Sequence, residues 1–124
     1  IGSSAALMCS TIPWNGPIAT VRVGRVNNDI IINPTRAEIK ESDLEMVVSG
    51  NDETIVMVEG VSDFITEDDV LAAIQYAHEV IKDIVSVQLE LVKDCGQTKR
   101  EVPEVIMLKL LLLELNQQTS KNIK

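Results

Sequence analysis

Aromatic residues are scarce in this sequence: Trp14, Phe64 and Tyr76 are the only three among 124 residues. The core must therefore be built from Val, Ile, Leu, Met and Ala, which suits a protein that mixes sheet and helix. A chain of this length forms about one domain and can bury a sizeable core. Nothing in the composition indicates disorder, a collagen-like repeat or a disulfide scaffold.

A basic excess is also missing. The chain carries 19 acidic and 11 basic residues, a formal net charge of -8. This charge argues against a nucleic-acid coat protein, but it does not exclude nucleic acid bound at one local basic site. Arg22 and Arg25 lie three residues apart in an expected strand, so they project to opposite faces. At most one of them faces a ligand while the other pairs with an acid, and Arg36 is the third basic candidate.

The chain has only two cysteines and no apolar run long enough to span a membrane. Cys9 and Cys95 lie far apart in the sequence without metal-type spacing, so we expect reduced, buried thiols. The most apolar stretch, Val105 to Leu115, contains Lys109 and is shorter than the roughly 20 residues that span a membrane. With no secretory signal pattern, the sequence predicts a soluble intracellular protein. Because residue 1 is Ile rather than Met, we expect a segment of something longer.

The usual catalytic motifs do not occur. There is no Gly-rich phosphate loop, no nucleophile elbow and no Cys or His pair with metal spacing. The lone His78 is interpreted as a packing or hydrogen-bonding residue. Ser3 and Ser4 have neither a preceding strand nor a basic partner for phosphate. A cluster of acids favours a helix start through the helix dipole more than it favours a cation site. These acids are Asp63, Glu67, Asp68 and Asp69.

Four strands are expected in the first half of the chain, after a small-residue helix that ends within Gly2 to Thr11. Ile18 to Val26 and Ile30 to Asn33 are rich in β-branched residues and flank an Asn-Asn-Asp turn. The following polar stretch predicts a loop with at most one helical turn. Leu44 to Ser49 alternates, with Leu44, Met46 and Val48 on one face. Thr54 to Glu59 is apolar on both faces, which favours a central strand covered on both sides.

A long helix follows. Thr66 and Asp69 indicate its start, and Lys93 and Gly96 its end, which predicts roughly 28 residues. Its apolar face is expected to comprise Val70, Ile74, Ala77, Ile81, Ile84 and Leu91. A linker up to Pro103 and a second helix, Glu104 to Gln117, complete an α+β pattern dominated by antiparallel pairing.

Several motifs resemble one family in their order along the chain. They are "IPWNGPIATVRVG", "NPT", "LEMVVSG" and "VMVEG", followed by "AHEVIKDI" and "CGQTKREV". This series resembles the second half of the first RNase PH-like core domain of the polynucleotide phosphorylases (polyribonucleotide nucleotidyltransferases). The resemblance implies an RNase PH-like half-domain, in the ribosomal protein S5 domain 2-like fold class, over residues 1–103. Residues 104–124 would start a helical segment where the interdomain helical domain of the family begins.

The resemblance also implies a function for the whole protein. Enzymes of this family degrade RNA from the 3′ end with phosphate, release nucleoside diphosphates and use a divalent metal, here Mg²⁺. They form homotrimeric rings around an RNA channel, work with other RNA-degradation proteins, and lie in the bacterial cytoplasm or in organelles. This segment would serve ring assembly and channel architecture. The alternatives are a stand-alone RNase PH-type or exosome-like ring subunit, and an interaction module with no RNA role.

The same resemblance predicts no catalytic, cofactor-binding or metal residue in this segment. In the catalytic second domain of the family, the matching strand carries an Asp and, two residues later, a Lys, with another Asp about six residues before the first. Those positions hold Glu45, Val47 and Ile39 here. Phosphorolysis must neutralise the negative charge of phosphate, and a lysine at position 47 would supply the positive charge. The serines that bind phosphate in the family lie further upstream, so Ser3 and Ser4 are not their counterparts.

Overall fold

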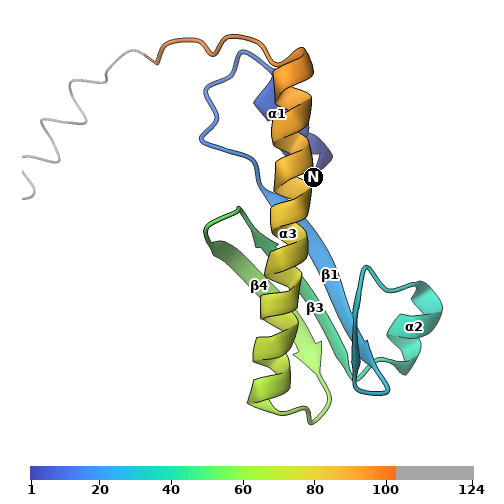
Figure 1. The fold of residues 1–124 in the computed structure, drawn as a ribbon. Helices are drawn as coiled ribbons and strands as arrows, with labels where there is room; N and C mark the ends of the chain where they lie inside the picture. The colour runs from blue at the N-terminus through green and yellow to red at the C-terminus, as the bar shows by residue number, and fades with distance from the viewer. Residues whose placement is uncertain (103–124) are drawn as a thin grey trace, which may run out of the picture.

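The computed structural model describes residues 1–102 (Figure 1). The elements are α1 (Gly2–Cys9), β1 (Ala19–Val26), β2 (Asp29–Ile32), α2 (Arg36–Glu41), β3 (Leu44–Gly50), β4 (Ile55–Ser62) and α3 (Glu67–Cys95). The strands form one antiparallel sheet in the order β2-β1-β3-β4, and α3 runs along one face of it. The expected α+β class, with antiparallel strands and a long helix, is confirmed. The expected segment 104–124, including its helix, lies outside the described residues.

The hairpin between β1 and β2 is tighter than the sequence pattern predicted. Asn27 and Asn28 both have positive φ, at 53° and 68°. Asp29 pairs with Val26, so the turn has two residues, and Asp29 belongs to the strand. Asparagine tolerates the left-handed conformation that such a turn needs at both central positions.

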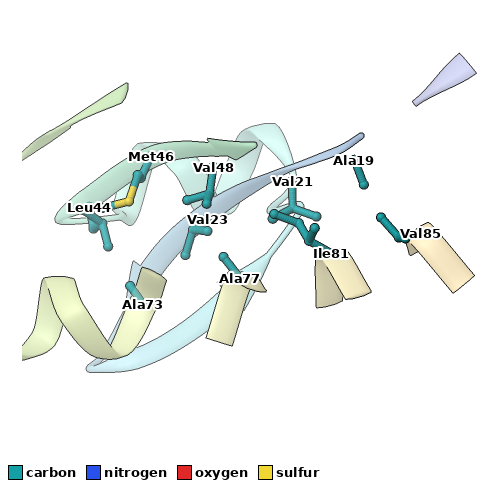
Figure 2. Close-up of a cluster of buried hydrophobic side chains, with 10 residues drawn as sticks. All are labelled: Ala19, Val21, Val23, Leu44, Met46, Val48, Ala73, Ala77, Ile81 and Val85. Carbon is teal, nitrogen blue, oxygen red and sulfur yellow. The ribbon is translucent and has the colours of Figure 1, made fainter. Parts of the chain in front are cut away.

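The core lies between the inner face of the sheet and α3 (Figure 2). In β3 the expected alternation is confirmed: Leu44, Met46 and Val48 are buried. They meet buried residues of β1 and of the helix. The full buried cluster is Ala19, Val21, Val23, Leu44, Met46, Val48, Ala73, Ala77, Ile81 and Val85. The small side chains of Ala73 and Ala77 allow the helix to lie close to the sheet.

The helix α3 extends over 29 residues, close to the predicted length. Thr66 caps its start by accepting a hydrogen bond from the Asp69 backbone, and Gly96 follows its end, as predicted. Its buried face is partly different from the prediction. Ala77 and Ile81 are buried, but Leu91 is 44% exposed. The predicted face omitted Ala73 and Gln88, which are buried, because these two residues are less apolar than their neighbours.

The prediction that Thr54 to Glu59 forms a central, doubly covered strand is wrong. β4 is an edge strand that pairs only with β3 among the described residues. The helix packs over β1 and β3, and in β4 only Ile55 is partly buried while the following residues are exposed. Val56, Val58 and Val61 are therefore 64%, 45% and 72% exposed. The apolar pattern correctly indicated a strand, but it could not show which neighbours cover it.

The stretch expected to be a loop with at most one helical turn contains α2, held by a capping box. The Glu38 carboxylate accepts a hydrogen bond from the Thr35 backbone at 2.7 Å, and the Thr35 hydroxyl accepts one from the Glu38 backbone. The hydrogen bond from the Thr35 backbone holds the pKa of Glu38 below its usual value. The Thr-x-x-Glu signal for this cap was present in the sequence.

The two cysteines do not match the expectation of buried thiols. Both are free, as predicted, but Cys95 is exposed and Cys9 is half-buried. Their sulfur atoms lie 3.4 Å apart, at the ends of α3 and α1. Two helix ends that are distant in sequence meet here, which sequence spacing could not show. Within residues 1–102, no helix combines the length and the apolar character needed to cross a membrane.

Candidate functional site

The outer face of the sheet, opposite α3, is hollowed at β3 and β4. One hollow of about 210 Å³ is lined by the end of α2, the residues after it and the far end of β4. A second, of about 300 Å³, lies over the middle of the two strands. Glu45 and Val61 line both, so the hollows adjoin. We call this concave surface the β3–β4 hollow.

The three positions singled out by resemblance meet in this hollow. Ile39, from α2, lines the first part together with Glu45. Val47 lines the second part, again together with Glu45. Residues 45 and 47 share a face because they are two apart in a strand. The structure therefore brings these positions together, but one carboxylate and two apolar side chains occupy them.

The charges around the hollow are mostly negative. Glu45 pairs with Arg22 of β1, whose Nη1 lies 3.3 Å from the carboxylate, and both side chains are about half exposed. Asp43, Asp63 and Glu59 add further carboxylates to the lining, which contains no lysine or arginine. A phosphate ion in the hollow would face carboxylates with no free cation in the lining. The hollow therefore lacks the positive charge that phosphoryl chemistry requires.

Arg25 lies on the opposite face from Arg22, as predicted, and only 8% of it is exposed. Its Nε and Nη2 donate to the two carboxylate oxygens of Asp43 at 2.9 and 2.7 Å. Its Nη1 lies 2.7 Å from Asp69 at the start of α3. Both ribbon arginines thus pair with acids, so neither presents a free guanidinium to a ligand. Arg36 is exposed at the first turn of α2.

These ion pairs shift the pKa values of the acids. The hydrogen bond from Arg25 holds the pKa of Asp43 below its usual value. For Asp69, the hydrogen bond from the Thr66 hydroxyl is the largest cause of its lowered pKa, and Arg25 adds to it. The paired carboxylates raise the pKa of Arg25 in turn. The three groups form a charged link between β1, the segment before β3 and α3.

The other candidate side chains have structural partners. His78 Nε2 lies 3.1 Å from the carbonyl oxygen of Asn51, in line with its interpretation as a hydrogen-bonding residue. The Ser4 hydroxyl is buried and accepts a hydrogen bond from the Ile18 backbone at 2.8 Å. Ser3 is exposed.

A magnesium ion does not fit the residues that the structure describes. Mg²⁺ prefers several oxygen ligands in an octahedral arrangement. In residues 1–102, no group of three or more His, Cys, Asp or Glu side chains is placed to hold a metal. Asp69 already binds Arg25 and Thr66, and Glu45 binds Arg22. We therefore derive no chemical step through Mg²⁺ in this segment.

One lysine with a specific role was missed by the sequence pattern. The ammonium group of Lys99 donates to the carbonyl oxygens of Leu7, Met8 and Ser10 at 2.8, 2.7 and 2.8 Å. Leu7 and Met8 lie in the last turn of α1 and Ser10 caps its end, so the ammonium group closes this helix end where few N–H donors remain. No local signal could have identified this contact, because its partners lie about 90 residues apart in the sequence.

Comparison with known proteins decides the family. Residues 16–80, just over half of the chain, match the model of the 3' exoribonuclease family, domain 2. The chain belongs to this family. It is 50% identical over 107 residues to the polyribonucleotide nucleotidyltransferase of Syntrophotalea carbinolica, covering 85% of this chain. It is 41% identical over 124 residues to that of Citrifermentans bemidjiense, covering all of the chain, and 49% identical over 102 residues to that of Natranaerobius thermophilus, covering 82%.

The match covers a small part of each relative but most of the described fold of this chain. The chain spans only 15%, 18% and 14% of the lengths of these three relatives. The family match covers every strand of the sheet and the first half of α3, so the hollow and the arginine pairs lie within it. The resemblance stated from the motifs is thereby confirmed.

Proposed function

We propose that this chain is one segment of a phosphorolytic 3′–5′ exoribonuclease, a polyribonucleotide nucleotidyltransferase. The observation that carries the proposal is the 50% identity to a protein of that name over 85% of the chain. The other relatives given above carry the same name, which favours this reading over a stand-alone RNase PH-type or exosome-like subunit. The whole enzyme converts RNA and phosphate to nucleoside diphosphates.

Several properties of the whole enzyme follow from the same proposal. It uses Mg²⁺, held by residues outside this segment, since residues 1–102 place no group of three or more His, Cys, Asp or Glu side chains to hold a metal. It assembles as a homotrimer and works with other RNA-degradation proteins. Its location is the bacterial cytoplasm, with an organelle as the alternative.

Within this enzyme, we propose that the segment is structural and non-catalytic. Its β3–β4 hollow carries Ile39 and Val47 at the positions where the resemblance expects an acid and a lysine in a catalytic domain. Glu45 remains, and its carboxylate pairs with Arg22. The segment contributes the sheet and the long helix on which other parts of the enzyme assemble.

A segment exchange tests both proposals. Residues 1–102 would replace the matching segment of the Syntrophotalea carbinolica protein, and phosphate-dependent release of ADP from poly(A) would be measured. We expect the chimera to keep activity within about tenfold of the parent, because a structural segment of the same family supports the same assembly. The matched control carries Glu45→Gln in the grafted segment, which should leave activity unchanged.

Two results would contradict the proposals. A chimera with the parental elution volume and circular dichroism but without activity would show that the segment does not serve this enzyme. Loss of activity only in the Glu45→Gln chimera would show that the segment contains a catalytic or substrate-binding residue.

A further inference from the structure

The ends of α1 and α3 place two thiols in contact. Figure 1 shows α1 beside the orange end of α3. The Cys9 and Cys95 sulfur atoms lie 3.4 Å apart although the residues are 86 positions apart in the sequence. Neither thiol has a role in the proposed function. We propose that Cys9 and Cys95 are a dithiol oxidation site, at which a hydroperoxide forms an intramolecular disulfide that thiol reductants reverse.

The surroundings favour closure of this bond. Cys95 is exposed, so an oxidant of the size of hydrogen peroxide can reach it. Each cysteine is the last residue of its helix and is followed by an extended residue, Ser10 or Gly96. A disulfide needs its sulfur atoms about 2.05 Å apart. A small movement of two helix ends closes the remaining gap without disturbing the sheet.

Other contacts hold the two thiols together before any oxidation. The backbone of Gln97 donates to the carbonyl of Cys9 at 3.0 Å, and that of Arg100 donates to Thr11 at 2.8 Å. Lys99 adds its three hydrogen bonds to the end of α1. The folded chain thus raises the effective concentration of one thiol at the other, which favours the intramolecular disulfide over intermolecular ones.

The reaction balances with a hydroperoxide as the oxidant. The thiolate of Cys95 attacks one peroxide oxygen, the O–O bond breaks, and a sulfenic acid and water result after proton transfer. The Cys9 sulfur then attacks the Cys95 sulfur, the S–O bond breaks, and the leaving hydroxide takes the remaining thiol proton as water. Two thiols lose two electrons and one hydrogen peroxide gains them. The hydrogen bond with Cys9 raises the pKa of Cys95, so oxidation is slower than at an activated thiol.

The test uses the reduced 124-residue chain, treated with hydrogen peroxide, quenched with N-ethylmaleimide and digested with trypsin. We expect mass spectrometry to detect one cross-link between the peptides 1–22 and 94–99. Its formation should be at least about tenfold faster in the native protein than in concentrated urea, because the fold supplies the proximity. The thermal midpoint should rise by about 10 °C on oxidation and return with dithiothreitol.

The variants Cys9→Ser and Cys95→Ser should each abolish the cross-link and the change in midpoint. Equal rates in native and denaturing buffer would overturn the proposal. So would intermolecular disulfides as the main product, or sulfinic acid at Cys95 without a cross-link. The comparison of native with denatured wild-type protein decides the question even if a serine variant does not fold.

Discussion

The guanidinium of Arg25 binds the carboxylate of Asp43 through two parallel hydrogen bonds, Nε to Oδ1 at 2.9 Å and Nη2 to Oδ2 at 2.7 Å. This geometry is the strongest form of ion pair in proteins. Because Asp69 binds the same guanidinium, one buried side chain joins the sheet to the start of α3. The pairing indicates that Arg25 supports the fold.

Replacing Arg25 by methionine should therefore destabilise the chain. The substitution keeps apolar bulk but removes the buried guanidinium that both carboxylates bind, and the loss of one hydrogen-bonding partner leaves the other unsatisfied. We expect the thermal midpoint to fall by about 10 °C or more. The matched control is Arg22→Met, whose half-exposed pair with Glu45 should change the midpoint by only about 2 °C. Equal shifts in differential scanning calorimetry would contradict the structural role of Arg25.

The same group of charges should make stability sensitive to acid. The pKa values of Asp43 and Asp69 are lower in the folded chain than in the unfolded chain. Folding therefore gains stability from these groups above the ordinary aspartate pKa of about 3.9, and loses it as the pH falls through the lowered folded values. Thermal midpoints measured from about pH 5 to about pH 2 should decline less steeply in Arg25→Met than in the wild type. Parallel curves would show that Arg25 does not cause the shifts.

The β3–β4 hollow should not become active when two of its residues are replaced. Val47→Lys combined with Ile39→Asp introduces the residue types that the resemblance assigns to the catalytic second domain of the family. We expect no phosphate-dependent release of nucleoside diphosphate from RNA, because by the resemblance Ser3 and Ser4 are not the counterparts of the serines that bind phosphate in the family. The assay is chromatography of the products, with a full-length relative as the positive control. Appreciable release of diphosphates by the double variant would overturn the assignment of the hollow.

Single-stranded RNA should bind this chain weakly or not at all. The net charge is -8, and both ribbon arginines are already paired with carboxylates. Few phosphates could be neutralised, so any binding should have a salt dependence of about one or two contacts. The three aromatic residues are scattered along the chain and form no stacking series. Titration of a labelled oligonucleotide at several salt concentrations measures this, and micromolar affinity with a steep salt slope would reveal an RNA site.

The exposed edge of β4 should promote self-association. Within residues 1–102 no strand pairs with its outer side, and Val56, Val58 and Val61 are exposed beside it, a combination that pairs readily with another strand. Sedimentation at high concentration should show dimers or larger species of the wild-type chain. Val61→Lys should reduce them, whereas Val87→Lys, on an exposed part of α3, should not. A strictly monomeric wild-type profile would contradict this prediction.

The sequence predicted the elements better than their surroundings. The alternation in β3 and the caps of α3 are local signals, so the bounds of these elements could be read from neighbouring residues. Whether β4 is covered depends on where α3 lies on the sheet. The position of α3 depends in turn on small buried residues such as Ala73, which contribute little to a hydrophobic pattern in the sequence. The contact of Cys9 with Cys95 depends on the whole path of the chain, which no spacing rule contains. In the hollow, the resemblance predicted which residues matter, but only the structure shows that Ile39, from a helix, joins two strand residues.

The three carbonyls that receive the ammonium group of Lys99 also determine its reactivity. All three of its N–H donors are engaged, and these hydrogen bonds hold the nitrogen against the end of α1 and away from a reagent. The rate at which an amine-selective reagent labels Lys99 therefore follows how often α1 separates from the segment after α3. This lysine is a natural reporter of local opening at that junction, readable by mass spectrometry without any added probe on the chain.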